Sequence, residues 1–230
     1  MKAMILAAGR GERMRPLTDH CPKPMLFAGG KPLIVWHIER LARAGIHELV
    51  INHAHLGHVL EERLGDGSEW GVSIRFSPEA EALETAGGIA NALPLLGDAP
   101  FLVVNGDVYC ALDYATFVAR ALMRLTQGRL AHIALVDNPP HHPEGDFVLD
   151  ASGQVLADDG GSRLTFSGIG VYRPTLFSAV EHGHKARLAP LLHAAIRNNQ
   201  LSGEHFRGRW EDIGTPERLA ALDAELRQTS

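Results

Sequence analysis

The fold is decided by the strand-like stretch Lys2–Leu6, with the sequence KAMIL, and by the segment AAGRGERM that follows it at residues 7–14. An apolar run that ends in a glycine-containing turn is typical of the first strand of an α/β protein, which brings its loop to the carboxyl edge of the sheet, where ligands bind. Gly9 and Gly11 let the backbone approach a phosphate closely and point N–H groups at it. The nearby basic side chains are Arg10, Arg13, Arg15 and Lys23. The stretch therefore predicts a site for a nucleoside triphosphate.

Two common phosphate-binding loops do not fit the sequence. A Walker A loop needs two glycines separated by four residues and followed by Lys and then Ser or Thr, and no segment has this pattern. The dinucleotide fingerprint needs a third glycine at the position of Met14. An ordinary strand-to-helix turn with solvated arginines would explain the glycines. It gives no reason for Pro22–Lys23–Pro24, in which two prolines stiffen the backbone around one lysine.

Composition places the chain among globular α/β proteins. With 230 residues, of which 45% are hydrophobic, it can bury the core of one domain. The net charge of −5 argues against general affinity for nucleic acid, so a polyanion site has to be local. Cys21 and Cys110 form no disulfide pattern, which favours a reducing compartment. Because no apolar run could span a membrane and the N-terminus has no signal-peptide pattern, we expect a cytoplasmic protein without membrane partners.

Hydrophobic periodicity predicts alternating strands and helices up to residue 138. Helices are expected from Pro32 to Gly45 and at about Leu56–Leu64, Gly87–Leu96, Tyr114–Leu125, Ala186–Asn198 and Pro216–Leu226. Further strands are expected at Leu49–Ile51, Val72–Phe76, Phe101–Val104, His132–Val136, Phe147–Leu149, Val155–Ala157, Leu164–Tyr172 and His205–Trp210. The alternation predicts an α/β fold with a doubly wound, mostly parallel mixed sheet. The short strands after Pro139 predict a small antiparallel region beside it.

Aspartates follow two of the expected strands. Asp107 comes directly after a buried strand, where Gly106 lets the chain turn, and Asp212 follows the expected strand His205–Trp210. Asp is a hard oxygen ligand suited to Mg²⁺, which takes one or two protein carboxylates together with substrate phosphates. Asp107 alone could equally cap a helix, and the second carboxylate shifts the balance toward a metal site.

Taken together, these segments resemble the signature of the sugar-1-phosphate nucleotidyltransferases. The resemblance rests on residues 2–13, on Pro16–Leu17–Thr18, on Pro22–Lys23–Pro24 and on the two aspartates, and it spans essentially the whole chain. It implies one Rossmann-like nucleotidyltransferase domain over residues 1–230. This domain would have a nucleotide-binding part at 1–138, a sugar-binding part at 139–210, and the last metal ligand with a helix at 211–230. It also implies an enzyme in which a sugar 1-phosphate attacks the α-phosphorus of a nucleoside triphosphate and pyrophosphate leaves.

The same resemblance implies roles for individual residues. Asp107 and Asp212 would hold the catalytic Mg²⁺. Arg13 would hold the departing pyrophosphate, and Lys23 would lie over the α-phosphate and the attacking sugar phosphate. Arg15 is the weaker candidate, because the family's arginine follows the second loop glycine by two residues. The implied nucleotide-binding residues are Ala8, Gly9, Gly11, Glu12, Arg13, Lys23, Glu79, Gly87 and Asn105.

The base is left open by this resemblance. Residues 77–79 and 83–88 match the segment that lies along the base, so the side chain of Glu79 and the backbone of Gly87 would contact its edge. Glutamine is common at the position of Glu79 in thymidylyl- and some uridylyltransferases, whereas glutamate also occurs in guanylyl-transferring relatives. Glu84 stands where glycine is usual. We favour UTP as the substrate.

The acceptor side departs more from the family pattern. The implied substrate-binding residues are Asn105, Gly145, Asp158 and Gly168. Between the positions of Gly145 and Gly168 the family usually has Glu-Lys-Pro, and its lysine helps to bind the sugar phosphate. This chain has Ala157–Gly161, in which Asp158 or Asp159 would replace the glutamate and no lysine follows. Another cation must therefore bind the phosphate. The arginines near the expected sugar site are Arg163, Arg207 and Arg209.

Three alternatives stay open. The acceptor could be another sugar 1-phosphate, such as that of mannose or glucose, or phosphocholine. A non-catalytic nucleotide-sugar sensor would have the same fold, although it would be free to lose Arg13, Lys23 and the two aspartates. A zinc site could use the histidines, but they lack a supporting ligand pattern. Those histidines are His53, His55, His58, His141 and His142.

Overall fold

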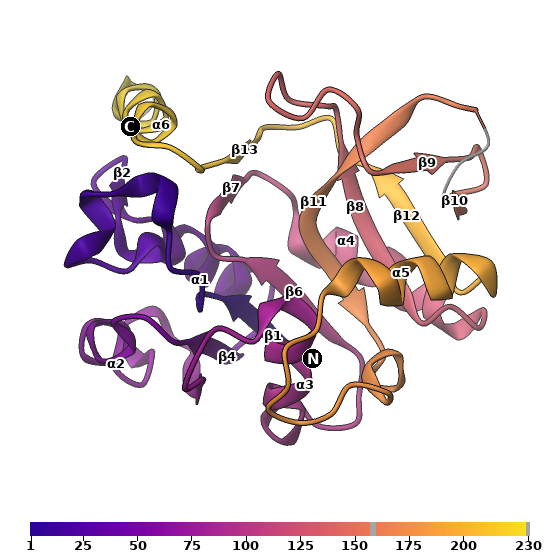
Figure 1. Ribbon diagram of the computed structural model, residues 1–230, viewed down its shortest axis with the longest axis horizontal. Helices are drawn as coiled ribbons and strands as arrows, with labels where there is room; N and C mark the ends of the chain where they lie inside the picture. The colour runs from indigo at the N-terminus through magenta and orange to yellow at the C-terminus, as the bar shows by residue number, and fades with distance from the viewer. Residues whose placement is uncertain (157–159, 229–230) are drawn as a thin grey trace.

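A nine-stranded mixed sheet forms the centre of the molecule in the computed structural model, which describes residues 1–156 and 160–228 (Figure 1). Its parallel part has the order β6 (Phe101–Asn105), β1 (Lys2–Leu6), β4 (Glu48–His53) and β5 (Ser73–Pro78). Next to β6, the antiparallel strand β11 (Arg163–Tyr172) carries the sheet on to β8 (Ala131–Val136), β9 (Phe147–Leu149) and β10 (Val155–Leu156). Strand β12 (Leu201–His205) pairs parallel with β8. The predicted α/β fold with a mixed sheet and antiparallel strands after residue 139 is confirmed.

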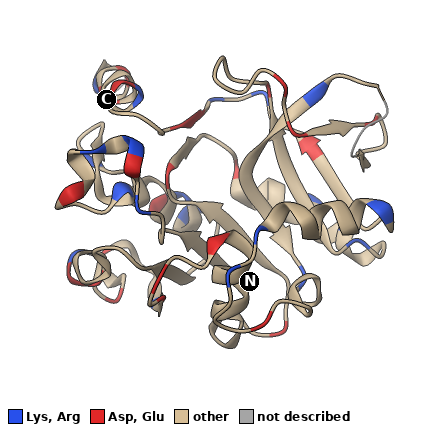
Figure 2. Ribbon diagram, in the orientation of Figure 1, with Lys and Arg blue, Asp and Glu red and all other residues tan. Residues whose placement is uncertain are grey.

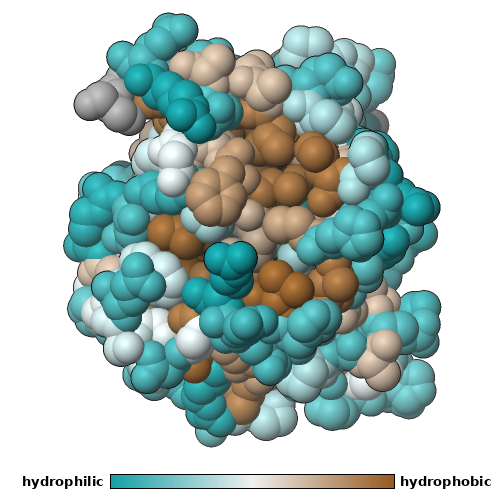
Figure 3. Space-filling model, turned by 90° about the vertical axis from the view of Figure 1, so that its left-hand side faces the viewer, coloured by the Kyte–Doolittle hydropathy of each residue, from teal (hydrophilic) through white to brown (hydrophobic). Residues whose placement is uncertain are grey.

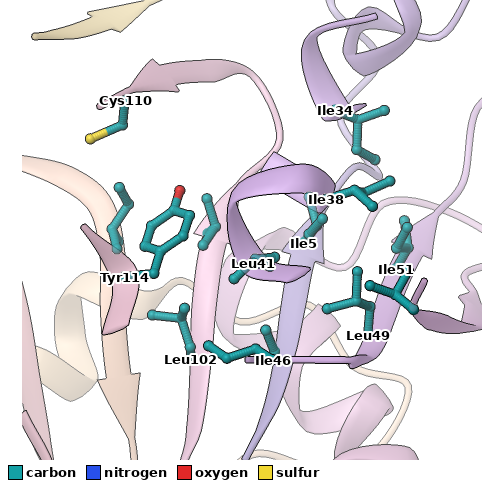
Figure 4. Close-up of a cluster of buried hydrophobic side chains, with 14 of the residues drawn as sticks. Ile5, Ile34, Ile38, Leu41, Ile46, Leu49, Ile51, Leu102, Cys110 and Tyr114 are labelled. Carbon is teal, nitrogen blue, oxygen red and sulfur yellow. The ribbon is translucent and has the colours of Figure 1, made fainter. Parts of the chain in front are cut away.

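Helices cover both faces of this sheet. One face packs against α1 (Leu33–Arg43), α2 (Gly57–Leu64) and α4 (Tyr114–Thr126), and the other against α3 (Glu84–Leu96) and α5 (Leu188–Arg197). Successive residues of a strand point to opposite faces, so Ile5 packs in the α1 cluster and Met4 in the α3 cluster. Figure 4 shows Ile38 and Leu41 of α1 beside strand residues such as Ile5. The two apolar layers hold the strand ends rigidly, which positions the loops that follow them.

Two short pairings complete the part of the fold that concerns the site. Strand β7 (Val108–Cys110) pairs antiparallel with β13 (Trp210–Asp212), and β2 (Phe27–Ala28) with β3 (Lys31–Pro32). Helix α6 (Pro216–Gln228) packs against β2. Single turns of 3₁₀ helix occur at η1 (Glu12–Met14), η2 (Leu17–Asp19), η3 (Lys23–Met25), η4 (Ser68–Trp70) and η5 (Pro174–Phe177).

The predicted strand at His205–Trp210 is wrong. The chain forms two strands instead, β12 before it and β13 after it, and residues 206–209 connect them. Strand β12 has no apolar run because it contains Ser202 and Gly203, both buried against β8. A Cβ on Gly203 would lie 3.0 Å from the backbone oxygen of Ile133, so the small residue serves the close approach of the strands.

The surface carries mixed charge, and apolar side chains gather on one of its faces. Lys and Arg occur on many segments and alternate with Asp and Glu (Figure 2). On the face where α2, α6 and β2 lie, brown apolar side chains gather inside a hydrophilic surround (Figure 3). Phe27 is 59% exposed and lines a cavity of about 580 Å³, which shares no residue with the two cavities described below. Among the described helices, none has the length and apolar character needed to cross a membrane.

Candidate active site

Two cavities open at the carboxyl ends of the parallel strands and share part of their walls. The first cavity, of about 360 Å³, lies between the loop after β1, the ends of β4 and β6, and the start of α3. The second cavity, of about 300 Å³, lies between the end of β6, residues 139–142, β11 and β13. Asn105 and Asp107 line both. Ligands in the two cavities would therefore meet at these two side chains.

Asp107 is held at this junction by the backbone of neighbouring strands. The N–H of Gly106 donates to the oxygen of Leu6 at 2.9 Å, and a Cβ on Gly106 would come within 2.7 Å of that oxygen. Only glycine lets the ends of β1 and β6 approach so closely. The N–H of Ile213 donates to the oxygen of Asp107 at 3.0 Å, and Asp212 ends β13, the partner of β7. The pairing places Asp212 opposite Val108, the residue that follows Asp107, so the two aspartates lie close together although they are far apart in the sequence.

Each aspartate has a cationic partner. Lys23 Nζ lies 2.6 Å from Oδ2 of Asp107. Nη1 of Arg218 donates to the backbone oxygen and to Oδ2 of Asp212, both at 2.9 Å, and Nε2 of His141 lies 3.2 Å from the same Oδ2. Within residues 1–156 and 160–228, no three His, Cys, Asp or Glu side chains form a metal-binding group. One carboxylate on the wall shared by the two cavities (Asp107) and a second one in the second cavity (Asp212) fit Mg²⁺, which takes its remaining ligands from phosphates and water.

Two arginines converge at the edge of this site. A Cβ on Gly214 would lie 3.3 Å from Nη1 of Arg13 and 3.2 Å from Nη2 of Arg218, so both guanidinium groups flank this glycine. Arg13 is exposed in η1, and no acidic side chain in the described part of the chain pairs with it. Converging like charges without an acid for each of them favour an anionic ligand at this position.

A buried histidine supports β7 from the α1 side. His37 is fully buried, its Nε2 lies 2.6 Å from the oxygen of Val108, and its Nδ1 lies 2.8 Å from the hydroxyl of Tyr114. Burial lowers the pKa of His37 to about 4, because a charged imidazole would lose its hydration there. The neutral ring then donates to Val108 and accepts from Tyr114. This arrangement anchors the strand that follows Asp107.

The predicted site residues divide into three groups. Those that line the first cavity are Ala8, Gly9, Lys23, Asn105 and Asp107, and those that line the second are Asn105, Asp107, Gly168 and Asp212. Those that line neither are Gly11, Glu12, Arg13, Glu79, Gly87 and Gly145. Asp158 lies outside the described residues. Gly168 has a φ of 79° at an irregularity of β11, and a Cβ there would lie 2.5 Å from Nδ2 of Asn105. This glycine therefore sets the position of the shared asparagine.

Glu79 has a structural environment that the sequence did not predict. Its side chain is buried, and Oε1 accepts from Nδ2 of Asn52 at 2.7 Å while Oε2 accepts from the N–H of Leu83 at 2.8 Å. Oδ1 of Asn52 in turn accepts from the N–H of Ala7 at 2.9 Å. The chain of hydrogen bonds links β1, β4 and the segment before α3 into one wall of the first cavity. Contact of Glu79 with a base stays a prediction.

Lys185 lines the first cavity although no motif predicts it. The segment before α5 docks on the start of α3, where the oxygen of Ala186 accepts from the N–H groups of Ala86 and Gly87 at 2.9 and 3.1 Å. Gly87 allows this contact, since a Cβ would lie 2.4 Å from a backbone oxygen of that segment. Other cavity residues outside the predicted set include Asn52, Ala82, Glu84 and Thr85 in the first, and His141, His142 and Trp210 in the second.

The arginines suggested for the acceptor lie elsewhere. Arg163, Arg207 and Arg209 do not line the second cavity. Arg209 is paired with Glu211 and Glu225 at 2.7 and 2.8 Å. The side chains found at the second cavity are instead the imidazoles of His141 and His142, and the guanidinium group of Arg218 contacts His141. The sequence singles out the histidine pair only as a possible zinc site.

Comparison with known proteins assigns the chain to a family. The sequence model of the family described as nucleotidyl transferase matches residues 2–229. The chain belongs to this family. This nucleotidyl transferase is 56% identical over 226 residues to N-acetylmuramate alpha-1-phosphate uridylyltransferase of Neisseria meningitidis serogroup B, with 97% of each chain covered. It is 30% identical to the protein of the same name from Caulobacter vibrioides, with 97% of this chain and 96% of that one covered.

The fold of this nucleotidyl transferase is also found among solved structures. A protein from Bacillus anthracis, described as a candidate glucose-1-phosphate thymidylyltransferase and solved with sucrose, aligns with a TM-score of 0.84. The alignment covers 99% of this chain and 95% of that one at 24% sequence identity. At this identity the likeness concerns the fold, and it confirms the predicted arrangement of sheet and helices.

Proposed function

We propose that this nucleotidyl transferase transfers UMP from UTP to N-acetylmuramate α-1-phosphate, giving UDP-N-acetylmuramate and pyrophosphate in peptidoglycan recycling. The observation that carries the proposal is the meeting of two cavities at Asn105 and Asp107, which provides one cavity for each anionic reactant. The name of the relative from Neisseria meningitidis, with 56% identity over nearly the whole of both chains, supports the choice of substrates.

In this proposal, UTP binds in the first cavity and the sugar 1-phosphate in the second. A bond forms between an oxygen of the sugar phosphate and the α-phosphorus, and the bond from that phosphorus to pyrophosphate breaks. Asp107 and Asp212 would hold Mg²⁺, which when bound supplies neutralisation of phosphate charge. Since both reactants are anionic, the protein contributes mainly orientation and further positive charge.

Lys23 and Arg13 would supply this positive charge to different phosphates. Lys23 is only 7% exposed and lines the first cavity beside Asp107, so its ammonium can turn from Asp107 to the α-phosphate. Arg13 lies at the edge of the site, where it would hold the leaving pyrophosphate. A charge-assisted hydrogen bond that strengthens as charge moves onto the leaving group lowers the barrier rather than KM.

The second cavity supports an acidic acceptor. N-acetylmuramate α-1-phosphate carries a lactyl carboxylate in addition to its phosphate, so its pocket needs more than one cation or N–H donor. His141 and His142 line the second cavity, and Arg218 lies 3.1 Å from Nε2 of His141. These groups replace, in the proposal, the lysine that the sequence lacks.

The test is a panel of triphosphates and sugar 1-phosphates with Mg²⁺, in which pyrophosphate release is measured. We expect UTP with N-acetylmuramate α-1-phosphate to give the highest kcat/KM. Equal or higher values with the 1-phosphates of N-acetylglucosamine, glucose or mannose would overturn the acceptor assignment. A preference for GTP or dTTP would overturn the base assignment and leave nucleotidyl transfer intact.

A further inference from the structure

Glu84 adopts a backbone conformation that side chains rarely take. Its φ is 63°, and it shares a positive φ with only two other non-glycine residues in the described part of the chain, Leu56 and Asn199. A left-handed conformation brings Cβ too close to the following carbonyl oxygen, so glycine is the residue that fits without strain. Such residues persist where the surrounding structure holds them, and they concentrate at ligand sites.

The surroundings of Glu84 hold its backbone in place without using its side chain. Before it, the oxygen of Leu83 accepts from the N–H of Ala186 at 3.0 Å, and after it the N–H of Ala86 donates to the oxygen of Ala186 at 2.9 Å. These contacts are made by backbone atoms, so glycine could make them equally well. An acidic residue in the first turn of a helix is favourable, but this benefit is smaller than the usual cost of a left-handed side chain.

The side chain of Glu84 belongs to the first cavity. Glu84, Thr85 and Ala82 line one wall, and Ala8 and Gly9 of the loop after β1 line another. The described ion-pair partner of Glu84 is Arg187, whose Nε is 3.8 Å from Oε1, longer than a hydrogen bond. About half of the side chain is exposed. Its carboxylate is therefore available to a ligand.

The other carboxylates at this end of the cavity are already engaged. Both oxygens of Glu79 accept hydrogen bonds, and Glu81 pairs with Lys185 at 2.7 Å. Lys23, proposed to bind phosphate, and Asp107, proposed to bind Mg²⁺, line the same cavity but come from other segments, η3 and the turn after β6. A carboxylate would repel phosphates, so its place is with the part of the ligand that carries N–H or O–H donors.

We propose that Glu84 is a specificity-determining residue that accepts hydrogen bonds from the nucleoside of the bound triphosphate. The inference rests on the proposed function, because it assigns the first cavity to a nucleoside triphosphate. The donors that a ribonucleoside offers are its ribose hydroxyls and the N–H groups of its base. The strain of the left-handed conformation is retained because it places a carboxylate where glycine would leave none.

The test compares the wild-type protein with Glu84→Gly and Glu84→Gln in binding and thermal unfolding. Kd values for UTP, dUTP, CTP and GTP are measured by calorimetry in the presence of Mg²⁺ and without acceptor. We expect Glu84→Gly to weaken UTP binding by about 10- to 100-fold, as the loss of a charged hydrogen bond does. Glu84→Gln keeps an acceptor but not the charge, so it should weaken UTP binding less. The Tm of Glu84→Gly should not fall and should rise by up to about 3 °C as strain is relieved.

The nucleotides distinguish the source of the donor. If wild type binds dUTP as weakly as the Glu84→Gly variant binds UTP, the donor is the ribose 2′-hydroxyl. If the variant loses affinity for UTP while its affinity for CTP or GTP is unchanged or improved, the donor belongs to the base. Both results support the proposal.

Asn199→Gly provides the matched control, because Asn199 has a φ of 53°, is exposed and lines neither cavity. Its affinities should equal those of wild type. Unchanged affinities of both Glu84 variants for all four nucleotides would overturn the inference, and a lower Tm of Glu84→Gly would assign the residue to the helix terminus instead. Failure of wild type to bind any of the triphosphates would overturn the proposed function itself.

Discussion

Lys23 Nζ lies 2.6 Å from Oδ2 of Asp107, so the group proposed to neutralise the α-phosphate is paired with a group proposed to hold the metal. A buried ammonium needs an anionic partner. When the nucleotide binds, a phosphate can replace the carboxylate of Asp107 as the anionic partner of Lys23. A divalent cation can likewise replace Lys23 as the cationic partner of Asp107. Each exchange makes the other easier, which links binding of the nucleotide to binding of the metal.

Removal of either carboxylate should abolish most of the activity and leave the fold intact. Asp107→Asn and Asp212→Asn keep the shape of the side chain and lose a charged metal ligand, so we expect turnover to fall by orders of magnitude. Pyrophosphate release measures turnover, and circular dichroism checks the fold. Glu211→Gln is the control, because Glu211 is adjacent to Asp212 but pairs with Arg209 at 2.7 Å.

Chelation of metal gives an independent readout of the same site. Excess EDTA should stop pyrophosphate release by the wild-type protein, and added Mg²⁺ should restore it. Near-normal turnover of either aspartate variant at saturating Mg²⁺ would remove that residue from the metal site. Full activity in EDTA would contradict metal dependence altogether.

Loss of either Lys23 or Arg13 should lower kcat more than it changes KM. Lys23→Ala and Arg13→Ala each remove a group that neutralises charge on the phosphates, and such a loss costs about 10²–10³ in kcat. Arg15→Ala is the matched control, since Arg15 is exposed and pairs with Asp19 at 2.8 Å. Steady-state kinetics with UTP varied at saturating acceptor would show the difference. Wild-type kinetics in both variants would mean that neither side chain acts on the phosphates and that the segment after β1 is an ordinary strand-to-helix turn.

The parts of the fold that follow from hydrophobic pattern could be predicted from the sequence. The apolar run Phe101–Val104 is buried on both faces. The short apolar strand that begins at Lys2 brings the loop with Gly9 and Gly11 to the edge of the sheet. Strand β12 could not be predicted, because its residues Ser202 and Gly203 are small and its stability comes from pairing with β8. In that strand, long-range packing decides the structure rather than local propensity.

The candidate site divides in the same way. Asp107 and Lys23 follow local motifs, since the sheet edge and the two prolines set their positions. Lys185 could not be predicted, because a segment about a hundred residues further along the chain docks on the start of α3. Arg218 follows Asp212 by six residues in the sequence, but its contacts with Asp212 and with the distant His141 depend on tertiary structure.

Acid should destabilise the fold through His37. Its folded-state pKa of about 4 lies below the ordinary value of 6.5, so the unfolded chain binds the proton more readily. The stability that neutral His37 gives to the fold is fully present above pH 6.5. It is lost as the pH falls toward 4, which lowers the free energy of unfolding by a total of about 3 kcal/mol. His37→Gln does not titrate in this range. The difference in unfolding free energy between wild type and variant, from urea melts, should therefore shrink as the pH falls. Parallel profiles would contradict this assignment.

Arg218 should matter most for an acceptor that carries a carboxylate. Its Nη1 is engaged by Asp212 and His141, and its Nη2 faces Gly214 beside Arg13. Arg218→Ala should lower kcat/KM for N-acetylmuramate α-1-phosphate by about 10- to 100-fold, as the loss of a charged hydrogen bond does.

The loss with N-acetylglucosamine 1-phosphate, which lacks the lactyl carboxylate, should be smaller. The contact of Arg218 with Asp212 affects both acceptors alike, so the ratio of the two kcat/KM values isolates the contact with the carboxylate. Arg218→Lys should restore part of this ratio, and Arg207→Ala, which removes an exposed arginine outside the second cavity, should leave it unchanged. Equal losses for both acceptors in Arg218→Ala would limit this arginine to positioning Asp212 or binding phosphate.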